Sequence, residues 1–375
     1  MSRTLASLST LATMMTGTAM ADVPNVAVDI APVHSLVAQV MDGVGTPDLV
    51  LPPGASPHAY NMRPSEAAAL QNADVVIWMG EDLAPWMEGA VETLAEGAAV
   101  LTLLEAEETT LLEFRESALF EKHSHGDDDH DHDHGDEHAE EGHDHEEHAD
   151  GEHDHDHDHD HEAHGDEDHA HDDHSEDDHA HVEHDDHAHD EHDDHAHDEH
   201  DGHAHGAFDS HAWLSTSNAA EWLNLIAAEL SAADPENAGA YFANAATARA
   251  SLDDLKSEVN SILDPVRGGS FVVFHDAYQY FETDFDFFAA GAISLSDATE
   301  PSPARIAEIQ DRVRSENITC VLAEPQFNAG IVSTILDGTD ANTGVSDPIG
   351  ASLEPGPTLY PQLIRNLATT LSDCM

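Results

Sequence analysis

The stretch DPENAGAYFANAATARASLDDLKSEVNSILDP, residues 234–265, contains the strongest helical pattern in the 375-residue chain. Asp234 and Pro235 suit the start of a helix, and Pro265 suits its end. A helix over 235–263 would be about 43 Å long, so we predict a rigid helix that joins two lobes. Its apolar residues recur in alternating steps of four and three, which places them on one face: Tyr241, Ala245, Ala248, Leu252, Leu255, Val259 and Ile262.

Short apolar runs alternate with helical patterns on both sides of this helix. Before it, we predict strands at 26–30, 48–51, 75–79 and 100–103, and helices at 33–41, 64–71, 86–94 and 217–232. After it, we predict strands at 270–274 and 320–323, and helices at 304–316, 329–335 and 359–371. This alternation is typical of mostly parallel sheets. We therefore predict an α/β protein with two (β/α) lobes, 22–234 and 265–375, joined by the helix at 235–264.

Residues 123–206 form an insert of different composition in the first lobe. They hold 29 of the 33 His and 37 of the 78 acidic residues, and they contain neither Lys nor Arg. Similar eight-residue units begin at Asp177, Asp185 and Asp193. High like charge and few apolar residues cannot offset the entropy lost on ordering, so we expect this insert to be disordered without metal.

The insert is rich in His-x-His pairs, whose two rings project to the same side of an extended chain. Neutral imidazole is a ligand that Zn²⁺ favours, and neighbouring carboxylates can accept the other ring N–H. A solvated acidic tract with no ligand role is the alternative, but it would not explain the many His. Cu²⁺ and Ni²⁺ bind imidazole at least as well. We predict weak, exchangeable metal sites with the candidate ligands His153, His155, His157, His159, His179, His181, His187, His189, His195 and His197.

The net charge of −67 excludes partners that require a basic surface. Nucleic acid and anionic membranes both need clustered Lys or Arg, so we expect neither as a partner. Residues 1–21 combine a short positive start, an apolar run and the cleavage signal Ala19-Met20-Ala21, which predicts a signal peptide. No later apolar run reaches the ~18 residues of a membrane span. We therefore expect a periplasmic protein that is neither inserted in the membrane nor lipid-anchored.

The chain has two cysteines, Cys320 and Cys374. In an exported protein an even pair predicts a disulfide, which here would tie the last helix to an internal strand. Two unpaired buried thiols are the alternative. Two cysteines are too few for a zinc site made of thiolates alone.

Three histidines outside the insert stand at loop positions next to predicted elements. His58 lies in a turn-rich loop after the 48–51 strand, His211 in the first segment after the insert, and His275 directly after the 270–274 strand. Open α/β sheets bind ligands beyond the carboxyl ends of their strands. Each histidine alone would be an ordinary polar loop residue, but the three could converge on one metal ion between the lobes.

Several motifs, in order, make the chain similar to the periplasmic zinc-binding proteins of ABC-type zinc uptake systems. They are LPPGASPHAYNMRPSEAAALQNADVV (51–76), DSHAWLS (209–215), FVVFHDAYQYFE (271–282) and CVLAEPQF (320–327), with an acidic His-rich insert before HAWLS. The resemblance covers residues 26–374. It implies two lobes with a metal site in the cleft between them, a joining helix and paired cysteines.

By this resemblance, the metal ligands are His58, His211 and His275, and the family's place for a fourth, carboxylate ligand falls at Asp347, unless water takes it. Pro57 stands where some relatives have a Glu ligand. His34 matches no ligand position, and we interpret Glu324 as structural.

The same resemblance implies a monomeric protein that captures Zn²⁺ with high affinity and delivers it to an ABC permease of the inner membrane. The permease in turn works with a cytoplasmic ATPase, and Zn²⁺ is the transported ligand. Two other functions remain open: a zinc buffer or storage protein, and a zinc hydrolase, since three His with an open position also describe catalytic zinc. We expect no enzyme, because no motif such as H-E-x-x-H supplies a general base.

Overall fold

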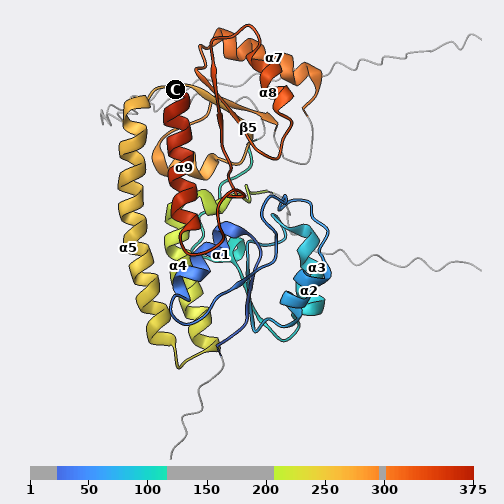
Figure 1. The fold of residues 1–375 in the computed structure, drawn as a ribbon, viewed down its shortest axis with the longest axis vertical. Coiled ribbons are helices and arrows are strands. Elements are labelled where there is room, and N and C mark those ends of the chain that lie inside the picture. The colour runs from blue at the N-terminus through green and yellow to red at the C-terminus, as the bar shows by residue number, and fades with distance from the viewer. Residues whose placement is uncertain (1–22, 116–206, 295–300) are drawn as a thin grey trace, which may run out of the picture. The chain divides into compact units, whose positions relative to one another are not determined.

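The computed structural model describes residues 23–115, 207–294 and 301–375, and within them the strands form two sheets (Figure 1). Each sheet has four strands, all parallel, in the orders β2-β1-β3-β4 and β6-β5-β7-β8. The first contains β1 (Val26–Val28), β2 (Asp48–Leu49), β3 (Val75–Trp78) and β4 (Ala99–Thr102). The second contains β5 (Phe271–His275), β6 (Gly291–Ser294), β7 (Cys320–Ala323) and β8 (Asn342–Val345). The predicted α/β fold with two parallel-sheet lobes is confirmed.

Helices pack on both faces of each sheet, which explains why the central strands are apolar throughout. In the first lobe, α2 (Pro64–Gln71) and α3 (Pro85–Leu94) bury one face, and α1 (Ala31–Val40) and α4 (Thr216–Ala233) bury the other. In the second lobe, α7 (Pro303–Ser315) and α8 (Ala329–Leu336) cover one face. Helices α6 (Gln279–Phe285) and α9 (Leu359–Cys374) belong to the core on the other face.

The long helix α5 (Ala238–Leu263) carries the predicted apolar stripe. The stripe is buried from Tyr241 to Val259, and Leu263 replaces Ile262 as its last buried residue. The helix begins three residues later than the sequence pattern indicates, because Asp234 ends α4 and holds the connecting turn. Its carboxylate accepts hydrogen bonds from the Asn237 side chain (2.7 Å) and the Tyr241 hydroxyl (3.0 Å).

The connection between the lobes is broader than a single helix. Helix α5 packs against α4, α1 and α9, and α1 of the first lobe also contacts α9 of the second (Figure 1). The Tyr360 backbone N–H donates to Ser35 Oγ at 2.9 Å, and the Tyr360 hydroxyl donates to Trp213 O at 3.0 Å. One apolar core runs continuously through these four helices and both sheets. The two lobes therefore share a core along their length.

The predicted disulfide is present between Cys320 in β7 and Cys374 at the end of α9. Three further elements, α6, β6 and β8, were not predicted from the sequence. β8 is an edge strand with the polar, glycine-containing sequence Asn342–Val345, and its exposed residues have no apolar alternation to reveal it.

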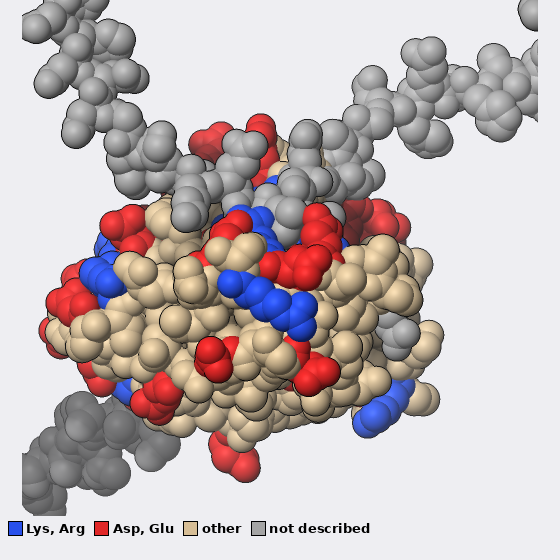
Figure 2. Space-filling view, turned by 90° about the horizontal axis from the view of Figure 1, so that it is seen from above, with Lys and Arg blue, Asp and Glu red and all other residues tan. Residues whose placement is uncertain are grey.

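The surface of the described part mixes charges of both signs. On the face in Figure 2, basic side chains lie among acidic ones, and residues of other types make up most of the area. Several arginines form ion pairs, such as Arg312 with Glu316 and Arg365 with Glu258. Within the described residues, no helix combines the length and apolarity of a membrane span. The predicted signal peptide (1–21) and the predicted insert (123–206) both lie outside the described residues.

Candidate metal site

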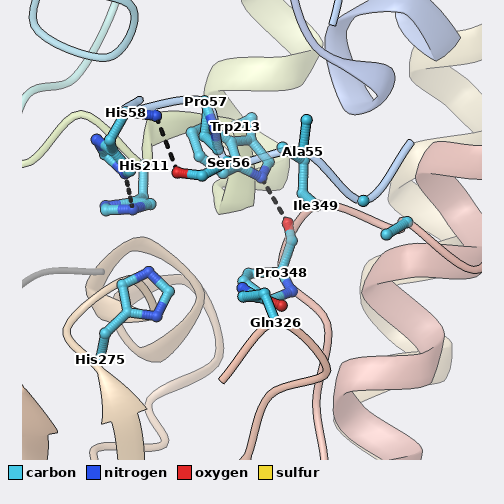
Figure 3. A pocket seen from close by; sticks show the side chains of 12 residues that line it. Ala55, Ser56, Pro57, His58, His211, Trp213, His275, Gln326, Pro348 and Ile349 are labelled. Carbon is cyan, nitrogen blue, oxygen red and sulfur yellow. Dashed lines mark hydrogen bonds between the residues drawn. The ribbon is translucent and has the colours of Figure 1, made fainter. Parts of the chain in front are cut away.

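A cavity brings together the three histidines that the sequence singled out (Figure 3). His58 and His211 come from the first lobe, and His275 comes from the end of β5 in the second. Its lining residues are Gly54, Ala55, Ser56, Pro57, His58, His211, Trp213, His275, Gln326, Pro348, Ile349 and Ala351. The cavity therefore lies where the predicted ligands from both lobes meet.

His58 belongs to a loop that is tied to the helices behind it. The Trp86 indole N–H, on α3, donates to Pro57 O at 2.7 Å, and the His58 backbone N–H donates to Ser56 Oγ at 3.2 Å. Tyr60 packs its ring edge against Trp86, and its hydroxyl donates to Glu66 of α2 at 2.9 Å. These contacts fix the backbone on both sides of His58.

His211 is oriented by Asp209, two residues earlier. Asp209 Oδ1 lies 2.7 Å from His211 Nδ1 and also accepts the His211 backbone N–H at 2.9 Å. Both residues are buried. Because a carboxylate accepts, Nδ1 carries the proton, and His211 Nε2 is left with its lone pair.

His275 has the same arrangement with a different partner. Its Nδ1 lies 2.7 Å from Glu324 Oε1, which also accepts the His275 backbone N–H at 3.2 Å. Glu324 directly follows β7, the neighbour of β5, so parallel strand ends bring the two side chains together. With Nδ1 bonded to the carboxylate, the lone pair of the neutral His275 ring is on Nε2, as in His211. Carboxylates that hold the second nitrogen in this way are typical of metal-binding histidines.

Two of the three rings have the spacing that one zinc ion requires. His58 Nε2 and His211 Nε2 are 3.2 Å apart, and two nitrogens about 2.0–2.1 Å from a tetrahedral zinc would be about 3.3 Å apart. The centroids of the His211 and His275 rings are 5.3 Å apart. As the described residues stand, no group of three or more His, Cys, Asp or Glu side chains among them is arranged so that it could hold a metal ion.

Asp347, the predicted fourth ligand, does not line the cavity. Its carboxylate accepts backbone N–H groups of its own loop, from Ile349 at 3.2 Å and Gly350 at 3.0 Å. It thereby shapes the loop whose Pro348 borders the cavity, and Pro348 O accepts the Trp213 indole N–H at 2.8 Å (Figure 3). Its role as a ligand stays a prediction.

Among the described histidines, His34 is the one that does not line this cavity. His34 is buried in α1 with its Nε2 3.0 Å from Pro47 O, and burial lowers its pKa. The candidate ligands of the insert, from His153 to His197, lie outside the described residues.

Sequence reasoning missed the partners of the ligand candidates. Asp209 was not singled out, although the spacing Asp-x-His in Asp209-Ser210-His211 is a local signal for a carboxylate that holds a histidine. Glu324 was interpreted only as structural, and nothing in a single sequence shows that β7 pairs with β5. Asp276, next to His275, is buried beside Arg115, and burial raises its pKa to about 7.

The comparisons with known proteins identify the family to which this fold belongs. Residues 26–374 match the family model described as the zinc-uptake complex component A, periplasmic. The chain is 41% identical over 350 residues to the high-affinity zinc uptake system protein ZnuA of Brucella abortus. The alignment covers 93% of this chain and 91% of the relative. It is 37% identical over 358 residues to the protein of the same name from Paracoccus denitrificans, covering 95% of this chain and 93% of the relative.

Solved structures share the fold at low sequence identity. A crystal structure of ZnuA superimposes with a TM-score of 0.63 at 18% identity, covering 94% of this chain and 99% of that chain. The solute-binding protein FpvC of Pseudomonas aeruginosa, solved with Mn²⁺, gives a TM-score of 0.62 at 17% identity, covering 94% and 97%. On the family match across nearly the whole chain and the 41% identity, the chain belongs to the ZnuA family of periplasmic zinc-uptake components.

Proposed function

We propose that this protein captures one Zn²⁺ ion tightly in the cavity between its lobes and delivers it to an ABC permease. His58, His211 and His275 are the proposed ligands, and water or Asp347 completes the coordination. The observation that carries the proposal is the pair of buried carboxylates, Asp209 and Glu324. Each holds an imidazole through Nδ1, which makes Nε2 the proposed metal-binding nitrogen.

The insert has a separate role in this proposal. Its many imidazoles collect ions weakly and raise their concentration near the cavity, which then holds one ion tightly. The family's relatives are named as parts of a zinc uptake system. That supports a permease and its ATPase as partners and the periplasm as the location.

The test of the tight site is a zinc titration in competition with a chelator, on the wild type, His58→Ala and His275→Ala. Loss of a residue that only orients a ligand weakens metal binding by up to about 100-fold. Removal of a direct ligand should weaken the tightest site by more than that. His153→Ala, in the insert, is the matched control and should leave that site unchanged. Tight binding that survives both cavity substitutions would refute the proposed ligands.

Delivery needs a separate experiment, because a zinc buffer would bind the ion equally well. In a deletion strain under zinc limitation, the wild-type gene should restore growth only when the permease is intact. Rescue without the permease would identify a buffer. Turnover of ester or CO₂ substrates by the zinc-loaded protein would identify a hydrolase.

A further inference from the structure

The chain on either side of residues 116–206 forms a short antiparallel pair, which we call the insert base (residues 111–115 and 207–211). Glu113 pairs with Phe208 in an antiparallel bridge. The Asp209 N–H donates to Leu112 O at 2.8 Å, and the Phe114 N–H donates to Ala207 O at 3.3 Å. His211 is the last residue of this base, so the position of the base also determines the position of a proposed ligand.

A single buried hydroxyl holds both strands of the base. Tyr280, on α6 of the second lobe, accepts the Leu112 N–H at 3.0 Å and donates to Asp209 O at 2.7 Å. Asp209 in turn fixes the His211 ring. A chain of contacts therefore runs from α6 through Tyr280 and Asp209 to His211.

A buried ion pair makes a second connection to the same helix. The Arg115 guanidinium lies 3.1 Å from Asp276 Oδ1 and 2.5 Å from Glu282 Oε2. Glu282 belongs to α6, and Asp276 directly follows the proposed ligand His275. Both carboxylates are almost fully buried. Arg115 thus ties the 111–115 strand of the base to α6 and to the residue that follows His275.

On the other side, the base is bound to the first lobe. Asn218 of α4 accepts the Thr110 N–H at 2.9 Å and donates to Thr110 O at 3.0 Å. We propose that Tyr280 and Arg115 are positioning residues, which hold the insert base on α6 and so set His211 at the correct distance from His275. This inference deepens the proposed function and rests on it.

The test compares Tyr280→Phe with Tyr241→Phe in the full-length protein. Tyr241 is also fully buried, and its hydroxyl also donates to an aspartate, but at the turn between α4 and α5. Zinc affinity is measured by chelator competition, and the visible absorption of the Co²⁺-loaded protein reports the ligand geometry. Tyr280→Phe should weaken the tight site about tenfold and alter the Co²⁺ spectrum. Tyr241→Phe should change neither, although both variants lose a buried hydrogen bond.

Arg115→Lys provides an independent variant. It keeps the positive charge but loses the forked guanidinium that spans two carboxylates, so it should also weaken zinc binding and alter the Co²⁺ spectrum. Wild-type affinity and spectrum in both Tyr280→Phe and Arg115→Lys would overturn the inference and leave the proposed function standing. Equal weakening in Tyr241→Phe would also overturn it, because the effect would then be general loosening. A wild type that binds no zinc at His58 would overturn both proposals.

Discussion

Buried carboxylates decide which nitrogen of His211 and His275 faces the cavity. Asp209 and Glu324 each accept an Nδ1–H, which orients the ring and makes Nε2 a better electron-pair donor. In the proposed site, these bonds hold both rings in place before an ion binds. We therefore expect metal binding at the proposed site to depend on two residues that are not themselves ligands.

Neutral substitution of these carboxylates should weaken zinc binding while the ligands themselves remain. We expect Asp209→Asn and Glu324→Gln to raise the zinc dissociation constant by about 10–100-fold. Chelator competition measures the change. Asp234→Asn is the matched control, because Asp234 is equally buried but accepts its hydrogen bonds at the α4–α5 turn. An unchanged constant in Asp209→Asn and Glu324→Gln would show that the rings are oriented by other contacts.

The raised pKa of Asp29 predicts how the free energy of unfolding depends on pH. Its buried carboxylate accepts the N–H groups of Ile30 and Met79, both at 2.7 Å, yet burial raises its pKa from 3.8 to about 7. A carboxyl whose folded pKa is raised binds its proton more tightly when folded, so it stabilises the fold as pH falls from about 7 towards 4.

Between pH 8 and pH 5 this group should add about 2–3 kcal/mol to the free energy of unfolding. Asp29→Asn cannot titrate, so its unfolding free energy should lack that gain. Denaturant titrations of both proteins at the two pH values measure the difference. Parallel pH profiles for the wild type and Asp29→Asn would contradict the prediction.

At the scale of helices and strands, the spacing of apolar residues predicted the elements that bury one face. The stripe from Tyr241 to Val259 predicted α5 because a buried helix face repeats its apolar positions. The start of α5 was wrong by three residues, because the side-chain bonds of Asp234 hold a turn that a pattern of apolar residues does not reveal. β8 was missed for a related reason, since an exposed edge strand needs no apolar face.

The same limit applies to the candidate site. Its three histidines could be selected because His275 directly follows a predicted strand and all three stand in family motifs. The contacts of Glu324 and Tyr280 could not, because both depend on which segments lie side by side in space. Tertiary contacts of this kind leave no local pattern in one sequence.

The disulfide connects two elements, and its removal should lower stability without changing the site. Cys320 and Cys374 are 54 residues apart, and a closed loop of that length stabilises by about 4 kcal/mol in the chain-entropy model. We expect the Cys320→Ala/Cys374→Ala protein to lose about 2–4 kcal/mol of unfolding free energy. Denaturant unfolding measures the loss, and zinc titration should give the wild-type affinity because neither residue lines the cavity. Much weaker zinc binding would mean that the end of α9 also positions the ligands.

At the scale of the whole molecule, the shared core limits how the lobes can move. Helices α1, α4, α5 and α9 form one apolar cluster with both sheets, and Trp213 reaches Pro348 across the cavity. Opening by a wide rotation would expose much of that core to water. We therefore expect metal-free and zinc-loaded crystal forms to differ by small shifts in the lobes, and a large rotation between them would contradict this expectation.

The proposed function assigns tight zinc binding to the cavity and weak binding to the insert, so the two should be separable. Deletion of residues 123–206 removes 29 His but leaves the paired residues Glu113 and Phe208 in place. Because the insert base keeps its contacts with α6, His211 should keep its position. Calorimetric titration with Zn²⁺ should then show the loss of several weak sites, while the tight site keeps its affinity to within about threefold, a difference of less than 1 kcal/mol. Loss of tight binding with the insert would instead place the principal ligands among the deleted histidines.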